Sequence, residues 1–292
     1  MIRHERGTAL LLVLWVTVLL AALLIGLAAS SRSQGEAALY GAERVRAEYA
    51  AEAGLAHAIA GLRAPNARDR WVPDGRSHTF TFDGATVTVA VVDVTGLVDL
   101  NAASTGILRH LFTTAGADTA RAERLVGAIA DWRGGGLPQP GNVAGASRAR
   151  GSFRSIDQLA SLPGMDAHLF ARIEDAVTVF SGRGFPDASY AGPLVLASLQ
   201  GIDRAQAAAR VGDRRKRPAQ DGAGNGQAFG AAAGGGPLVA GHGGVVERVF
   251  SIAEMPDGTR AGVDVTVRLA LTGTGARPYK VLDWRADSAF AP

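Results

Sequence analysis

Residues 8–29 of this 292-residue chain contain no charged side chain and are rich in Leu, Val, Ala and Ile. About 20 such residues, each rising 1.5 Å along a helix, cross the roughly 30 Å hydrocarbon core of a bilayer. The segment must be helical there, because lipid offers the backbone no hydrogen-bond partners. Arg3 and Arg6 precede it, which favours a single-pass protein with a cytoplasmic N-terminus and its C-terminal part across the membrane.

Three kinds of N-terminal segment fit this run. A secretory signal peptide has a shorter apolar core of about 7–15 residues, although Ala28-Ala29-Ser30 resembles a cleavage site. An uncleaved signal anchor is the second. The third is suggested by Gly7, which separates the polar leader of residues 1–7 from the apolar run. The sequence Arg6-Gly7-Thr8-Ala9-Leu10-Leu11 resembles the processing site of type IV pilin-like precursors, in which a membrane protease cuts after the small residue and leaves the helix attached.

The helical pattern continues without proline from residue 33 to residue 63 and ends at Ala64-Pro65-Asn66. A single helix of about 55 residues is therefore expected, half of it in lipid and half packed on a globular head. This continuation favours the pilin-like interpretation, because a cleaved signal peptide would not lead into such a helix. The face expected to pack on the head comprises Leu39, Ala42, Val45, Tyr49, Ala53, Ala56, Ile59 and Ala60.

Beyond this helix the chain changes between strand and helix patterns. Residues 78–93 predict a β-hairpin that turns at Asp83-Gly84, because both positions of such a turn favour positive φ. Helical patterns then predict helices over Thr105–Ala115, Ala117–Arg133, Ile156–Leu162, Ala167–Phe180, Pro193–Gln200 and Asp203–Val211. A Gly-rich tract follows and predicts a flexible linker. Strand patterns return at Val245–Ala253, Val263–Leu271 and Tyr279–Trp284.

These elements predict an α+β fold. The late strands would join the early hairpin in one antiparallel sheet, packed on the long N-terminal transmembrane and amphipathic helix and interrupted by an inserted, mostly helical domain. The expected regions are a leader (1–7), a transmembrane helix (8–29), the amphipathic helix with the first hairpin (30–96), the inserted α-domain (97–212), the linker (213–244) and the C-terminal strands (245–292).

Signatures of catalysis are absent from the sequence. The six histidines are scattered, without the His-x-x-x-His spacing of a zinc site. The chain has neither a Gly-x-Ser-x-Gly elbow nor a phosphate-binding loop. Because it has no cysteine, thiolate catalysis and thiolate metal sites are excluded. We therefore expect a non-enzyme with no catalytic residue, no metal site and no cofactor.

Residues 153–165 offer one candidate for nucleic-acid binding. A short helix, the turn Leu162-Pro163-Gly164-Met165 and the start of a second helix resemble a helix–hairpin–helix unit, which often binds DNA phosphates through backbone amides. Asp166 replaces the second glycine of that hairpin, and its carboxylate opposes phosphate binding. A Pro-Gly turn between packed helices is the favoured interpretation, and no nucleic-acid partner is expected. A membrane-anchored DNA-binding protein of competence type is the alternative function.

Six short motifs follow one another along the chain: Arg6–Leu11, Val13-Leu14-Trp15, Val98–Ser104, Ala130-Asp131-Trp132, Phe153–Leu159 and Leu162–Met165. In this order they resemble the type II secretion minor pseudopilin family called general secretion pathway protein K. The resemblance implies a pilin head with a large inserted α-domain, at the tip of a periplasmic pseudopilus that promotes export of folded proteins. It also implies anchoring in the inner membrane, other minor pseudopilins as partners, and a prepilin peptidase that cuts between Gly7 and Thr8 before the new N-terminus is methylated.

Two further positions bear on this resemblance. Ordinary pilins carry Glu at the fifth residue after cleavage, where it meets the N-terminal amine of a neighbour, whereas this chain has Leu12. A buried carboxylate without its partner is costly, and a tip subunit has no neighbour above it to supply the amine. Family members also typically bind calcium in an acidic loop after the Asp-Trp pair. Calcium prefers several carboxylates, but no acidic residue lies between Arg133 and Arg150, so we expect this calcium site to be lost.

Overall fold

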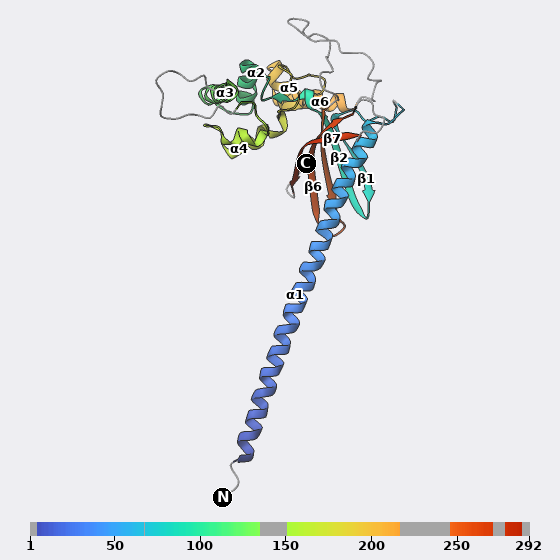
Figure 1. Cartoon of the computed structure of the whole chain (residues 1–292), viewed down its shortest axis with the longest axis vertical. Coiled ribbons are helices and arrows are strands. Elements are labelled where there is room, and N and C mark those ends of the chain that lie inside the picture. The colour runs from blue at the N-terminus through green and yellow to red at the C-terminus, as the bar shows by residue number, and fades with distance from the viewer. Residues whose placement is uncertain (1–4, 67, 135–150, 217–245, 271–277, 288–292) are drawn as a thin grey trace.

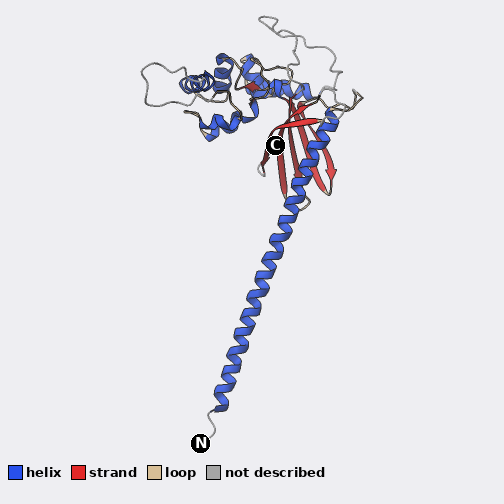
Figure 2. Ribbon diagram, viewed as in Figure 1, coloured by secondary structure: helices blue, strands red, loops and turns tan. Residues whose placement is uncertain are grey.

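The computed structural model describes residues 5–66, 68–134, 151–216, 246–270 and 278–287. Helix α1 (Glu5–Leu62) is a single long rod. Its C-terminal part lies against a β-sheet, and its N-terminal part projects away from the rest of the chain (Figure 1). The smaller helices gather at the end of the sheet farthest from the N-terminus (Figure 2). The expected long helix and its head are both confirmed by this arrangement.

The sheet is antiparallel, with the strand order β1-β2-β5-β6-β7. Its strands are β1 (Asp74–Phe82), β2 (Ala85–Asp93), β5 (Val246–Glu254), β6 (Arg260–Leu269) and β7 (Tyr279–Asp287). The turn of the β1–β2 hairpin is the predicted one, because Asp83 and Gly84 have φ values of 48° and 82°. Strand β5 pairs with β2, so the prediction that the late strands join the early hairpin is confirmed.

Helix α1 packs on the sheet through small residues. Alternate residues of β2, from Ala85 to Val91, are buried in this core, as the two-residue period of a strand requires. The approach is closest at Gly54, where an added Cβ would lie 2.9 Å from Val89 Cγ2 and 3.0 Å from Ser251 Cβ. The residues that α1 contributes to this core are Ala47, Ala50, Ala51, Leu55, Ala58 and Ile59.

The packing face predicted for α1 is therefore wrong at most of its positions. Val45 and Tyr49 are 48% and 65% exposed. Of the other residues predicted for that face, Ile59 is buried, Ala53 is half-buried and Ala42, Ala56 and Ala60 are exposed, while the Leu39 side chain lies outside the described part of the structure. The prediction chose the side of the helix that carries the larger apolar side chains, and this is not the side that packs on the sheet. Where the helix lies closest to the sheet, around Gly54, it presents mainly Ala and Gly, because larger side chains would hold the backbones apart.

Between β2 and β5 the chain folds around a second apolar core of its own. This insertion contains α2 (Thr105–Thr114), α3 (Thr119–Gly134), α4 (Ala167–Ile173), α5 (Pro193–Gln200), α6 (Arg204–Lys216) and the short 3₁₀ segments η1 (Val94–Gly96), η2 (Ile156–Ser161) and η3 (Glu174–Ala176). A two-stranded parallel ladder pairs β3 (Val98–Asp99) with β4 (Val177–Thr178). The mostly helical character predicted for this stretch is confirmed.

Three details of the insertion differ from the sequence prediction. The helix expected over Ile156–Leu162 is a 3₁₀ segment. The helix expected over Ala167–Phe180 ends at Ile173, because β4 follows and pairs with β3, which sequence patterns had not indicated. Helix α6 runs on past Val211 to Lys216. Three further predictions fall largely outside the described residues: the leader, most of the Gly-rich linker and the loop after Asp131-Trp132.

Candidate assembly surface

Within the projecting part of α1, the described segment from Leu10 to Leu24 is apolar on every side. From Leu10 to Leu24 its large apolar side chains are between 51% and 73% exposed. Gly7 and Thr8 lie in the first turns of this helix, and Leu12 follows at 66% exposure. A helix that is hydrophobic all round is normally surrounded by apolar material. Across the described residues, no helix is both long enough and apolar enough to span a membrane.

A second apolar surface continues along the part of α1 that covers the sheet. It consists of Ala42, Val45, Tyr49, Ala53, Ala56 and Ala60, and we call it the outer stripe. These residues recur every three or four positions, so they share one face of the helix, and that face is turned away from the sheet core. The helix is therefore apolar on two faces, one covered by the sheet and one exposed.

Ion pairs border the outer stripe. Arg44 pairs with Glu48 at 3.1 Å, and Arg46 pairs with Glu43 at 3.0 Å. Arg46 also reaches Asp83 in the turn of the β1–β2 hairpin, at 3.3 Å. All of these partners are largely exposed, so each pair contributes little to stability. The arrangement is an apolar band with a charged rim, which is the composition typical of a protein–protein contact.

The short sequence motifs of the insertion make contacts that hold its segments together. The buried carboxylate of Asp99 accepts hydrogen bonds from the backbone of Asn101 at 2.7 Å and of Gly182 at 2.7 Å. Asn101 in turn bonds both backbone groups of Phe153, at 2.6 and 3.0 Å. The Phe153 ring stacks on Trp132, with centroids 4.9 Å apart. These residues therefore hold distant segments together and are occupied by structural contacts.

Two helix caps explain other motif residues. Ser104 accepts a hydrogen bond from the Ile107 amide and is the N-cap of α2, a position that Ser favours. Ser155 begins η2 with a capping box in which the Gln158 side chain bonds back to the backbone of the cap.

The polar groups of the hairpin at residues 162–166 are also bonded to other residues of the insertion. Gly164 has a φ of 91°, and its carbonyl accepts a hydrogen bond from Arg121 Nε at 2.8 Å. Asp166 caps α4 by accepting from the Leu169 amide at 2.7 Å, and its carboxylate pairs with Arg121 at 2.5 Å. The hydrogen bond from Leu169 and the pairing with Arg121 lower the pKa of Asp166. A charged carboxylate thus lies at this hairpin, which favours a structural turn over phosphate binding.

The residues around the expected calcium loop offer few ligands. Asp131 is exposed, and Arg133 donates to the carbonyls of Leu100 and Ala103 at 2.6 and 2.7 Å. Within the described ranges, no group of three or more His, Asp or Glu side chains could hold a metal ion. Residues 135–150 lie outside the described residues, so loss of the calcium site stays a prediction.

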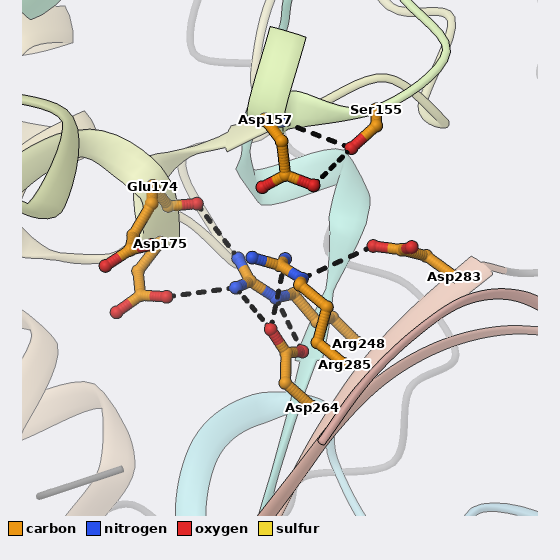
Figure 3. A network of polar contacts seen from close by, with 8 residues as sticks. All are labelled: Ser155, Asp157, Glu174, Asp175, Arg248, Asp264, Asp283 and Arg285. Carbon is orange, nitrogen blue, oxygen red and sulfur yellow. Dashed lines mark hydrogen bonds and ion pairs between the residues drawn. The ribbon is translucent and has the colours of Figure 1, made fainter. Parts of the chain in front are cut away.

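A buried polar cluster joins the insertion to the sheet (Figure 3). Arg248 in β5 donates to both oxygens of Asp264 in β6, at 2.9 and 2.7 Å. Across the boundary, Arg248 contacts the Glu174 carbonyl at 3.1 Å and the Asp175 carboxylate at 3.0 Å. The side chains of Arg248 and Asp264 are only 4% and 1% exposed. Sequence reasoning missed this cluster, although two opposite charges within otherwise apolar strands were a usable signal.

Comparison with known proteins gives one informative result. Neither a family model nor a curated protein matches this sequence. Among solved structures, the fold matches a chain in the crystal structure of the GspK-GspI-GspJ complex from the type 2 secretion system of enterotoxigenic Escherichia coli. The match has a TM-score of 0.53 at 15% sequence identity and covers 88% of this chain and 99% of the other. The two proteins therefore share a fold over nearly their whole lengths.

Proposed function

We propose that this chain is a minor pseudopilin of a type II protein secretion system, of the general secretion pathway protein K family. Its role is structural and non-catalytic: it forms part of the tip of the periplasmic pseudopilus and promotes the export of folded proteins. The observation that carries the proposal is that α1 exposes two apolar surfaces, the segment from Leu10 to Leu24 and the outer stripe. The fold shared with a chain of the GspK-GspI-GspJ complex supports it.

Residues 8–29 would anchor the chain in the inner membrane, with the N-terminus in the cytoplasm and the head in the periplasm. The support is the uncharged run itself, with Arg3 and Arg6 on the N-terminal side. A prepilin peptidase would cut between Gly7 and Thr8, and the new amine of Thr8 would be methylated. After processing, the protein would move from the bilayer into the pseudopilus, and its N-terminal helix would leave the lipid in that step.

Leu12 fits a position at the tip. A subunit inside the filament can satisfy a carboxylate at this place with the amine of its neighbour, whereas a subunit with nothing above it cannot. Burying an unpaired carboxylate in an apolar helix bundle is strongly unfavourable, so Leu is the residue expected there. The partners would be other minor pseudopilins, by analogy with the solved complex that contains three different proteins.

Substitution in the outer stripe tests the proposal. In the full-length protein, Tyr49→Glu should reduce co-purification with the other minor pseudopilins of the same secretion system at least about tenfold, because a central aromatic contact is replaced by an unpaired charge. The matched control is Phe185→Glu in the insertion, since Phe185 is 66% exposed and Tyr49 is 65% exposed. Unchanged co-purification of the Tyr49 variant, or equal loss in both variants, would count against assembly through α1.

A further inference from the structure

The junction between the sheet and the insertion is polar. The apolar core of the sheet and that of the insertion are separate clusters, and the side chains that cross between them are mostly charged. Arg248 crosses from the sheet to Glu174 and Asp175, and Arg215 crosses from α6 to the Asp74 carbonyl at 3.1 Å. Polar interfaces of this kind permit relative motion of the parts that they join.

Two carboxylates face each other at this junction. Asp93 ends β2 and Glu247 is the second residue of β5, and the two are paired in the antiparallel register. Directly opposed side chains lie on the same face of a sheet, with Cβ atoms about 5 Å apart. Asp93 is 8% exposed and Glu247 is 2% exposed. The chain leaves the sheet for the insertion immediately after Asp93, and Glu247 lies at the start of the strand by which the chain re-enters the sheet.

The two carboxylates differ in their hydrogen-bond partners. Asp93 accepts hydrogen bonds from the amide and hydroxyl of Thr95, at 2.8 and 2.6 Å. Glu247 Oε2 is buried and has no hydrogen-bond partner in the described structure. A carboxylate in that state is strongly disfavoured unless it holds a proton. Burial first, and then the charge of Asp93, raise the pKa of Glu247 well above its ordinary value.

The charges around the pair are of both signs. Asp74 in β1 and the segment with Asp187 and Tyr190 add negative or ionisable groups near it. Arg183 is the nearby cation that favours ionised Asp93. Arg214 in α6 is engaged by the carbonyls of Ala188 and Ala191, at 3.0 and 2.9 Å. Arg76 also pairs with Asp74 at 2.9 Å, so the flanking acids have cationic neighbours of their own, while Glu247 Oε2 itself stays without a hydrogen-bond partner among the described residues.

We propose that docking of the insertion onto the sheet is proton-dependent, with Asp93 and Glu247 as the sensor. With a proton on the pair, the two carboxyl groups lie side by side and the junction is closed. When that proton is lost, two adjacent buried charges repel each other at the points where the chain enters and leaves the insertion. The insertion is then held mainly by Arg248 and Arg215 and moves relative to the sheet.

The sign of the effect follows from proton linkage. A carboxyl group whose pKa is raised in the docked state binds its proton more tightly there than in the open state, so docking is favoured at low pH. The docked fraction falls as the pH rises through the pKa of the docked form and then levels off. One coupled proton changes the ratio of docked to open molecules by up to about tenfold per pH unit in that window.

Distance measurement between two spin labels tests this proposal on the full-length protein in detergent. The chain has no cysteine, so Arg124→Cys in α3 and Thr86→Cys in β2 give one label on each part, both at exposed positions. We expect one narrow distance distribution at about pH 5 and a second, broader population that grows toward about pH 9. Glu247→Gln should remove the pH dependence and retain the narrow distribution at both values.

Two further variants make the result unambiguous. Glu254→Gln is the matched control, because Glu254 lies at the exposed end of the same strand, and it should respond to pH like the unmodified sequence. Asp93→Asn provides a second removal of charge should the Glu247 variant fold poorly, and it should also suppress the pH response. A distribution that does not change with pH in the unmodified sequence would overturn the proposal, as would a full pH response in both Glu247→Gln and Asp93→Asn.

Discussion

Arg248→Ala is expected to lower the free energy of unfolding of the head by about 3 kcal/mol. The substitution leaves Asp264 buried at 1% exposure without its bidentate partner, and it removes the contacts to Glu174 and Asp175 that tie the insertion to the sheet. Breaking a buried ion pair costs about 3–5 kcal/mol. The lower end applies here because Arg285 still reaches Asp264 at 3.1 Å. Urea unfolding of the protein in detergent, followed by tryptophan fluorescence, measures this change.

An exposed ion pair between the same two strands, β5 and β6, provides the control. Arg260 pairs with Glu254 at 2.9 Å, and their side chains are 56% and 47% exposed. Arg260→Ala should therefore change the free energy of unfolding by less than about 1 kcal/mol. If both variants lost a similar amount of unfolding free energy, neither the burial of Arg248 nor its contacts across the junction would add to stability, and the prediction would be wrong.

Gly54→Leu is expected to destabilise the packing of α1 on the sheet by about 3 kcal/mol, at the upper end of the cost of overpacking a core. Even a Cβ at this position would overlap Ser251 Oγ and come within 3.0 Å of Ser251 Cβ and Val89 Cγ2. The helix would have to lift away from the sheet to admit the rest of the side chain. The same urea titration measures the loss of stability. Amide hydrogen exchange in α1 should also be faster in the variant than in the original chain.

Gly41→Leu separates this steric effect from helix propensity. Gly41 is in the same helix, and a Cβ there would meet nothing within 4 Å. Replacing Gly by Leu in an exposed helix favours the helix by up to about 1 kcal/mol, so this variant should be as stable as the original chain or more stable. If Gly54→Leu were equally well tolerated, the close contact between α1 and the sheet would be contradicted.

The sequence predicts most of the local structure where a strong pattern acts within a few residues. The Asp83-Gly84 turn follows from the preference for positive φ, and α2 begins at Thr105, the residue predicted from the helical pattern. Pro193–Gln200 forms a helix with the predicted bounds. The order of helix, hairpin, helical stretch and late strands also sufficed to predict a single sheet with an insertion, because antiparallel strands can pair across a long excursion of the chain.

Features set by tertiary contact were not predictable in this way. The α1 residues that pack on the sheet are determined by how closely Gly54 lets the helix approach, whereas sequence reasoning relied on the larger side chains Val45 and Tyr49. Strands β3 and β4 are two residues long and pair only because the fold brings residues 98 and 177 together. The Arg248 cluster and the Asp93–Glu247 pair likewise join residues far apart in sequence. The residue pattern within one strand or helix therefore does not predict them.

Processing of the N-terminus is the most direct test of the central claim that this chain is a pseudopilin. The measurement is the intact mass of the full chain after co-expression with a prepilin peptidase, alongside a control pilin and a Gly7→Val variant that should block the cut. We predict loss of residues 1–7 and addition of one methyl group to the amine of Thr8. A chain that stays uncut while the control pilin is cut, or a cut near Ser30 instead, would contradict this account.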